Sequence, residues 1–366
     1  MKGKNSTFGA SKSISMKNAI FSVLATFLLV FESCSTDVDI YAEYQDVAII
    51  YAMLNPRSDT NFVKITRAFC GSNDNPINAT EVALIADSSN YPGKLDARII
   101  ELKSSNGTAY EPTGRVLLLD TMTIHNKELG TFYAPDQKIY YTTERFNSGT
   151  DGKTYKYNLV VVKPNGDTVN ASTTMVGNEE FEIMTNGINF QAAPTEAMGK
   201  IVFRADGKAP LYEIKIQFNY LEQHSGQATK RKHIDRSFGI KSIYEYTRVE
   251  GYDNLYYLEY SLNWLFNALD SAIGNDTVVN GNHPNVVRQI GDFVVSISAA
   301  GDELYYYYLA NQAQWSSPYS LVTTYSNING GSGLFSSRTT IGRTMRLSAT
   351  TKRDLFSISA WGFIEQ

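Results

Sequence analysis

LYEIKIQFNYL, at residues 211–221, decides the fold class because apolar and polar side chains alternate along it without a break. In a strand, successive side chains point to opposite faces of the sheet. One face then carries Tyr212, Ile214, Ile216, Phe218 and Tyr220, and the other carries Glu213, Lys215, Gln217 and Asn219. One buried face and one solvated face are typical of an antiparallel sheet. We therefore predict a mainly β protein.

Further strand-like runs lie on both sides of this stretch. Segments rich in β-branched and aromatic residues predict strands at 47–54, 62–69, 97–102, 155–163, 167–175, 292–298, 334–348 and 355–363. Two of these runs are followed by Asn-Gly dipeptides, at residues 106–107 and 165–166. Because Asn-Gly tolerates the positive φ angles of a tight turn, both dipeptides predict hairpins.

Two segments of the second half have helical spacing instead. Ser261 is placed to cap a helix whose apolar residues are Leu262, Leu265, Phe266, Leu269 and Ile273, with Gly274 at its end. Asp302 is placed to cap a second helix over 303–313, with Leu304, Tyr305, Tyr308 and Leu309 on one face. The basic run at 230–233 is predicted to lie in a hairpin loop.

The predicted elements divide into two domains. Short strands with turns between them predict an immunoglobulin-like or fibronectin-like β-sandwich at 46–178. The mixture of strands and helices that follows predicts an α+β domain of antiparallel sheet with two or more helices at 179–366. The polar stretch at 177–199 is predicted to connect them. A chain of 366 residues is long enough for two such domains.

The N-terminal stretch MKNAIFSVLATFLLVFESCSTDVD, at residues 16–39, predicts where the protein resides. Lys17 precedes an apolar run that ends near Phe31, and the small residue Ser33 comes directly before Cys34, which is the layout of a cleaved secretory signal. We predict a signal peptide at 1–33, a lipid such as diacylglycerol with palmitate on Cys34, and a tether at 34–45. The alternatives are an N-terminal membrane helix or a soluble chain with an unmodified Cys34. The apolar run is shorter than the ~20 residues that span a bilayer.

The net charge and the number of cysteines limit which classes of partner and which disulfides are expected. The net charge is −4, and loss of residues 1–33 would remove four lysines against one glutamate, leaving a more acidic protein. This balance argues against nucleic acid and against non-specific adsorption to anionic lipid, since both need basic surfaces. With Cys34 lipidated, the second cysteine, Cys70, has no disulfide partner, so we expect a buried thiol.

Two short segments carry a resemblance. The polar, acidic stretch at 35–39 resembles the signal that sends lipoproteins of the Bacteroidota to the outer face of the outer membrane. The motif YSNINGGSGLF, at residues 325–335, resembles the C-terminal signature of a family of Bacteroidota outer-membrane lipoproteins, described as a domain of unknown function and commonly encoded beside TonB-dependent receptors. The resemblance implies an outer-membrane location, at the cell surface or on the periplasmic face, and a β-barrel partner. It implies no catalytic residues.

Two groups of residues are candidates for a ligand or partner surface. Asn327, Gly330 and Gly331 belong to the motif, where the glycines either form a turn that returns Leu334 and Phe335 to the core or expose backbone amides to a ligand. The aromatic residues Tyr305, Tyr306, Tyr307, Trp315 and Tyr319 either pack helices onto the sheet or form a platform for a sugar, a peptide or a protein. Four consecutive tyrosines on one helix cannot all face the core.

The sequence offers little for catalysis. Its four histidines stand in no metal-binding spacing, Gly331, Ser332 and Gly333 lack the flanks of a serine-hydrolase elbow, and acid pairs such as Glu179 and Glu180 are unspecific. We expect no enzyme, no metal and no cofactor. The predicted function is a surface-exposed accessory or ligand-binding partner of a TonB-dependent transporter or similar barrel. The alternative is a structural or assembly lipoprotein: an adhesin, a pilin-like subunit, or an accessory of outer-membrane export or insertion.

Overall fold

Strands dominate the computed structural model, which describes residues 46–68, 79–130, 132–149, 151–273, 286–316 and 325–365. Strands account for 50% of the structure and helices for 15%, in three sheets. The prediction of a mainly β protein is therefore confirmed. Cys34, Cys70, Tyr319 and the predicted signal peptide and tether lie outside the described residues, and so does the side chain of Trp315.

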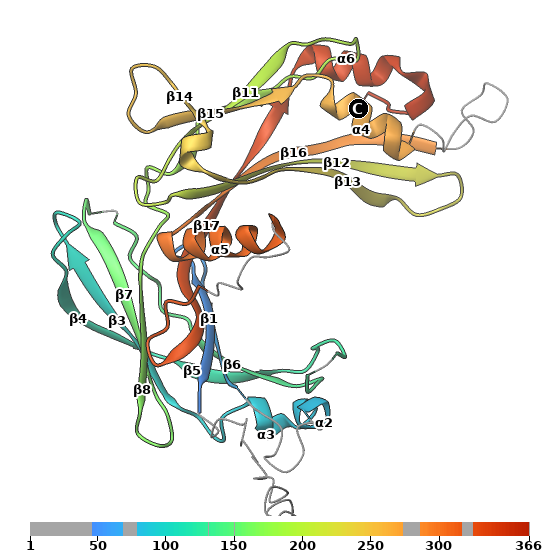
Figure 1. The fold of residues 1–366 in the computed structure, drawn as a ribbon. Coiled ribbons are helices and arrows are strands. Elements are labelled where there is room, and N and C mark those ends of the chain that lie inside the picture. The colour runs from blue at the N-terminus through green and yellow to red at the C-terminus, as the bar shows by residue number, and fades with distance from the viewer. Residues whose placement is uncertain are drawn as a thin grey trace, which may run out of the picture. The chain divides into compact units, whose positions relative to one another are not determined.

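The largest sheet crosses both halves of the sequence (Figure 1). Its strand order is β13 (Lys230–Ser242), β12 (Leu211–His224), β16 (Val286–Ala300), β17 (Gly331–Leu347), β1 (Ala48–Leu54), β2 (Asn61–Arg67), β6 (Gln137–Thr142) and β5 (Asp120–Ile124), with β10 (Gly187–Ile188) also paired to β17. The pairs are antiparallel except for β1 and β10 beside β17.

Two smaller sheets and the helices complete the described fold. One sheet has the order β4 (Glu111–Leu118), β3 (Asp96–Ser104), β7 (Thr154–Val162) and β8 (Thr168–Thr174). The other has the order β14 (Thr247–Arg248), β15 (Leu255–Ser261), β11 (Met198–Arg204) and β9 (Glu182–Ile183). The helices are α2 (Ala79–Ala83), α3 (Ala86–Ser89), α4 (Trp264–Ile273), α5 (Asp302–Ser316) and α6 (Ala349–Ser357), with short 3-10 turns η2 (Ile243–Glu245) and η3 (Ser359–Trp361).

The first core lies between two sheets. Inward residues of β1, β2 and β6, such as Ile50, Val63 and Tyr140, form one buried cluster with Ile99 of β3 and Leu159 of β7. Alternate residues of these strands are buried, because only one face of each sheet meets the other. The Asn-Gly dipeptides lie in the turns between β3 and β4 and between β7 and β8, as their hairpin signal predicts.

The second core confirms the alternation in residues 211–221. The predicted apolar face of β12 is buried, from Tyr212 to Tyr220, and packs in one cluster with residues of β11, β15, α4 and α6. Figure 1 shows these elements on one side of β12 and β16, with α5 on the other side. Both predicted helices exist, at α4 and α5. The outward face of β12, which carries Glu213, is therefore available to α5.

The two cores meet where β17 runs beside β1. The first seven residues of β17 pair in parallel with β1, in a register that places Gly333 opposite Ile50. Phe335 is fully buried in the first core, whereas Ile341 and Met345, farther along β17, belong to the second. A strand from the predicted second domain thus completes the sheet of the predicted first domain. The boundary between residues 178 and 179 stays a prediction.

The predicted connection at 177–199 is more structured than its polar composition suggests. Phe181 and Phe190 are buried in the second core, and β9 and β10 form within the stretch. The carboxylate of Asp206 accepts hydrogen bonds from the backbone amides of Gly177, at 2.5 Å, and Asn178, at 3.2 Å. These contacts hold the start of the connection against the loop that follows β11.

Two local predictions are wrong. Residues 355–363 form no strand: α6 ends at Ser357 and η3 follows, because the Ser348 hydroxyl caps the helix by accepting from the Thr351 amide at 3.1 Å. The basic run at 230–233 begins β13 instead of lying in the hairpin loop. β13 is an edge strand, where charged side chains discourage pairing with other chains.

Candidate binding site beneath the tyrosine-rich helix

The first turn of α5 is fixed to the sheets by hydrogen bonds. The amide of Gly301 donates to the carbonyl oxygen of Ser337 at 2.9 Å, and the amide of Leu304 donates to the hydroxyl of Ser336 at 3.2 Å. Both serines are fully buried on β17. The helix therefore begins at a defined place, beside the junction of the two cores.

The Glu303 carboxylate adds an anchor on a third element. It accepts hydrogen bonds from the hydroxyls of Thr173 on β8, at 2.7 Å, and Ser336 on β17, at 3.1 Å. Burial raises the pKa of Glu303, although these two hydrogen bonds act in the opposite direction. Glu303 thus ties α5 to both β8 and β17 and is committed to structural contacts.

The space beneath α5 measures about 540 Å³, which lies within the range of about 300–1,000 Å³ that is common for small-molecule sites. Its roof is the face of α5 that carries residues at spacing i, i+3, i+4 and i+7. Its floor is formed by outward residues of β12, β13, β16 and β17, with the inward-facing Tyr212 of β12 at the edge of the lining. The lining residues are Leu211, Tyr212, Glu213, Ile240, Ser298, Ala300, Leu304, Tyr307, Tyr308, Asn311 and Arg338. The pocket therefore combines an apolar body with a few polar groups.

The aromatic roof is held in place by hydrogen bonds. The hydroxyl of Tyr308 donates to the carbonyl oxygen of Ile240 at 3.1 Å and accepts from the Gln312 amide at 2.5 Å. The Asn311 amide donates to the carbonyl oxygen of Tyr307 at 2.8 Å. A tyrosine ring offers a ligand a large contact surface, and little side-chain conformational freedom is lost on binding.

Charged groups form the polar end of the pocket. Glu213 lies 3.2 Å from the guanidinium of Arg338 and 2.9 Å from the ammonium group of Lys215. The Arg338 guanidinium also donates to the Ser298 hydroxyl at 3.3 Å. Because this pair is partly solvated, its members remain able to exchange partners with a polar group of a ligand. The arrangement suits binding of an amphipathic molecule.

The chemistry of this lining gives no catalytic constellation. Among the described residues around the pocket, Glu213 is the only acid, and no histidine or cysteine is present. Across the described part of the chain, no group of three or more His, Cys, Asp and Glu side chains is arranged to hold a metal ion. No helix within the described ranges is long and apolar enough to cross a membrane.

The structure separates the predicted tyrosines. Tyr307 lines the pocket, whereas Tyr305 and Tyr306 do not. The rings of Tyr305 and Tyr306 make a tilted contact with centres 5.7 Å apart, and the Tyr325 ring lies 5.9 Å from that of Tyr306. Tyr306 is 51% exposed. The predicted helix face is also partly wrong: Leu309 is exposed, and Tyr307 takes the inward place expected for Tyr305.

The side chain of Asn327 hydrogen-bonds to the backbone of Phe335 in the way that the backbone of a neighbouring strand would. Its side-chain amide donates to the carbonyl oxygen of Phe335 at 2.7 Å, and its side-chain oxygen accepts from the Phe335 amide at 2.9 Å. The neighbouring Asn329 exchanges backbone hydrogen bonds with Asn170 of β8, at 2.8 and 3.1 Å. The motif thus joins β8 to the start of β17, away from the pocket lining.

The glycines of the motif allow close packing of strands. A Cβ atom at Gly331 would lie 2.6 Å from the carbonyl oxygen of Ala48, and one at Gly333 would lie 2.0 Å from that of Ile50. Gly330 and Gly333 have φ angles of +78° and +119°. These contacts favour the turn interpretation, in which the motif returns Leu334 and Phe335 to buried positions.

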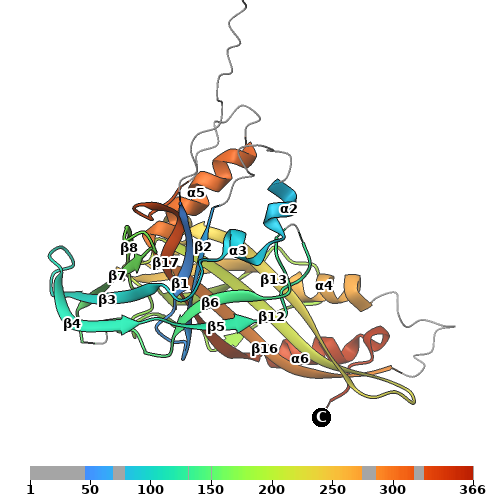
Figure 2. The same ribbon diagram turned by 90° about the horizontal axis from the view of Figure 1, so that it is seen from below.

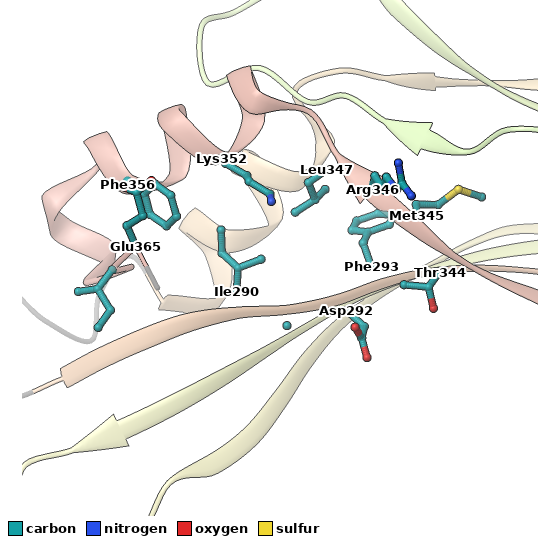
Figure 3. Close-up of a pocket in the computed structure, with 12 residues that line it drawn as sticks. Ile290, Asp292, Phe293, Thr344, Met345, Arg346, Leu347, Lys352, Phe356 and Glu365 are labelled. Atoms are coloured by element: carbon teal, nitrogen blue, oxygen red, sulfur yellow. The ribbon is translucent and has the colours of Figure 1, made fainter.

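A second cavity, of about 480 Å³, lies between α6 and the ends of β16 and β17 (Figure 3). Figure 3 shows Ile290 and Phe293 pointing from β16 toward the helix, whereas Asp292 and Thr344 point away from it. Lys352 of α6 reaches toward the space between them. The lining of this cavity is rich in polar residues, among them Arg346, Lys352 and Glu365. The pocket beneath α5 is the better candidate for a small-molecule site because it is larger and mostly apolar, with only a few polar groups.

Most of the pocket lining could not be predicted from the sequence. The alternation in residues 211–221 places Glu213 on the outward face of its strand, but no local pattern indicates that Ile240, Ala300 and Arg338 meet α5. These residues come from three different strands, which only the sheet order brings together. Neither a scan against models of protein families nor a search among curated proteins finds a match to the chain.

Proposed function

We propose that this protein is a non-enzymatic outer-membrane lipoprotein, anchored through Cys34 at the cell surface, that binds a ligand beneath α5 on behalf of a TonB-dependent transporter or a similar barrel. The observation that carries the binding role is the pocket of about 540 Å³, with its aromatic roof and charged end. The sequence at residues 16–39 and the resemblance of YSNINGGSGLF support the location and the partner.

The ligand class follows from the lining. Tyr307, Leu304 and Ala300 offer apolar contact, while Arg338 and Glu213 can each exchange an ion pair for a ligand carboxylate or amine. A molecule with an apolar body and a charged end therefore fits best. Polar sugars fit less well, because the middle of the pocket offers them few hydrogen-bonding groups.

We also infer that residues 46–178 form an immunoglobulin-type sandwich. Lettering β1 to β8 in chain order gives A, B, C, C′, D, E, F and G. The two sheets then have the orders A-B-E-D and C′-C-F-G, which are those of this class of sandwich. The parallel addition of β17 beside strand A extends the first sheet.

Native mass spectrometry of the lipoprotein, purified from outer membranes in mild detergent, tests the binding role. Asn311→Trp should fill the pocket and remove a co-purifying small molecule that the wild type retains. Tyr306→Trp is the matched control, because it adds the same ring on the exposed side of the same helix. Retention of the molecule by Asn311→Trp, or its absence from the wild type, would contradict the proposal.

Two further measurements test the anchor and the partner. Labelled palmitate should enter the wild type but not Cys34→Ser. A barrel protein should co-purify with the wild type in mild detergent. Homopolymers, with no ligand and no transporter, would favour the structural or assembly role instead.

A further inference from the structure

Four large apolar side chains are exposed on two neighbouring segments of the sandwich. Leu129 is 91% exposed, Ile85 56%, Phe132 54% and Leu84 53%. We call these four residues the entry rim. Single exposed apolar residues are ordinary on a protein surface, but a group of large ones indicates an interaction.

Hydrogen bonds hold the two segments of the entry rim together. The amide of Tyr133 donates to the carbonyl oxygen of Ala83, at the end of α2, at 2.8 Å. Leu84 and Ile85 directly follow Ala83, and Phe132 directly precedes Tyr133. The ammonium group of Lys127 lies 6.0 Å from the centre of the Phe132 ring. The loop between β5 and β6 is therefore docked on α2.

The chain enters the folded unit at the same end. The amide of Ala68 donates to the carbonyl oxygen of Val47 at 2.8 Å, and the hydroxyl of Tyr91 donates to the carboxylate of Asp46 at 2.9 Å. Arg67 of β2 donates to the carbonyl oxygen of Ser88 at 3.1 Å, which places α3 beside the end of β2 (Figure 2). The start of β1 thus lies next to α3, whose first residue, Ala86, directly follows the rim residue Ile85 in the chain.

A basic cavity lies behind the entry rim. It measures about 360 Å³ and includes both Ile49, near the start of β1, and Phe132 in its lining. Its lining contains three basic residues, Lys64, Arg67 and Lys127, and one acid, Asp136, which lies 2.8 Å from His125. Glu81 and Glu128, on the same segments as the rim, do not line it. The positive charge is therefore local, in a chain whose net charge is negative.

We propose that the entry rim docks on the lipid bilayer, with Leu129 and Phe132 in the headgroup region and the basic cavity facing lipid phosphates. This inference rests on the lipid anchor of the proposed function. Cys34 stands twelve residues before Asp46, a length that reaches at most about 40 Å. Acyl chains on Cys34 keep this end of the fold near the membrane, which is where apolar side chains backed by basic ones bind an interface.

Fluorescence of the full-length lipidated protein in vesicles of phosphatidylcholine and phosphatidylglycerol tests this inference. In a Cys70→Ser background, Leu129→Cys carries an environment-sensitive fluorophore. The control is Tyr244→Cys, which is 90% exposed on η2. Docking predicts blue-shifted emission at position 129 and quenching by spin-labelled lipid several-fold stronger than at position 244. Since both side chains are largely exposed, neither substitution should disturb folding.

Equal emission and equal quenching at the two positions would overturn the inference. So would a shift at position 129 that appears only when a barrel protein is added to the vesicles, because the rim would then be a protein interface. Mass spectrometry of Cys34 in the same sample separates the two proposals. A bare sulfur would refute the anchor. Quenching at position 129 when the unlipidated form of this protein is added to vesicles would still support docking of the entry rim on the bilayer.

Lys64→Ala tests the basic cavity. It should reduce the quenching at position 129 in vesicles that contain phosphatidylglycerol and leave it nearly unchanged in phosphatidylcholine alone, since attraction to anionic headgroups depends on charge. An equal reduction in both kinds of vesicle would contradict the electrostatic part of the inference. No change in either would contradict it as well.

Discussion

Replacing Gly333 with alanine should destabilise the protein strongly, because this residue lies where the two cores meet. Its φ angle is +119°, and an added Cβ atom would lie 2.0 Å from the carbonyl oxygen of Ile50. Ile50 is its partner in the parallel pairing of β1 with β17. The flexible end of a side chain could move away from such a contact, but a backbone carbonyl within a sheet cannot move alone.

The expected loss combines two terms. Holding a residue other than glycine at such a φ angle costs about 1–3 kcal/mol. Separating β1 from β17 disturbs packing around the buried Ile50 and Phe335, and overpacking of this kind costs about 1–3 kcal/mol more. A total of about 4 kcal/mol corresponds to a fall in melting temperature of roughly 6 °C for a folded unit of about 320 residues.

Gly226→Ala is the matched control. Gly226 also has a positive φ angle, +77°, but no heavy atom lies within 4 Å of the position of an added Cβ. Only the backbone term of about 1 kcal/mol should then remain, which is a fall of roughly 1.5 °C. Thermal unfolding followed by circular dichroism measures both variants. Equal, small shifts would refute the claim that close packing against β1 requires glycine at position 333.

Three further predictions concern buried polar groups. Burial alone would raise the pKa of Glu222, but hydrogen bonds from Arg288 and His224 outweigh this effect, so the pKa is lowered. The ionised carboxylate therefore stabilises the folded state, and this stabilisation is lost as the pH falls below about 4.5. Glu222→Gln should cost about 3–5 kcal/mol at pH 7, because it leaves the fully buried Arg288 unpaired, and less at pH 4; a loss independent of pH in urea unfolding would contradict this. Burial raises the pKa of Glu303, which means that its charged form at pH 7 destabilises the folded state. Glu303→Gln should therefore increase the free energy of unfolding by about 1 kcal/mol or less at pH 7 and leave it unchanged below pH 4.5, where the carboxyl group is protonated. A lower free energy of unfolding at pH 7 would oppose the reasoning. Asn327→Ala should cost about 1–3 kcal/mol in the same assay by leaving the buried backbone of Phe335 unpaired, whereas an unchanged urea midpoint would argue against that role.

Local patterns predicted the strands better than the helical details. The alternation from Tyr212 to Tyr220 appears as burial along β12, because side chains two residues apart share a face. The helix α6 was missed because its cap, Ser348, follows a long strand pattern and its inward face is short, with only Thr351 and Leu355 buried. A short apolar run does not distinguish a strand from a buried helix by spacing alone.

The candidate site was predicted only in part for a similar reason. The four tyrosines at 305–308 marked α5 as unusual, but which of them turn inward depends on how the helix rotates against the sheet. The hydrogen bonds that the Gly301 and Leu304 amides donate to β17, and those that the Glu303 carboxylate accepts from β8 and β17, fix that rotation. Residues more than 30 positions away provide those contacts, so no local spacing could reveal them.

The sequence by itself determined the mainly β class, the faces of β12 and the positions of the Asn-Gly hairpins, since each depends on residues that are close in the chain. It also carries the predicted Cys34 anchor, which lies outside the described structure. Only the tertiary structure decided that β17 pairs with β1, that α5 covers a pocket with a charged end, and that the entry rim lies beside the start of β1. Those features join segments far apart in sequence, and their free energy comes from packing and hydrogen bonds that form only when the sheets assemble.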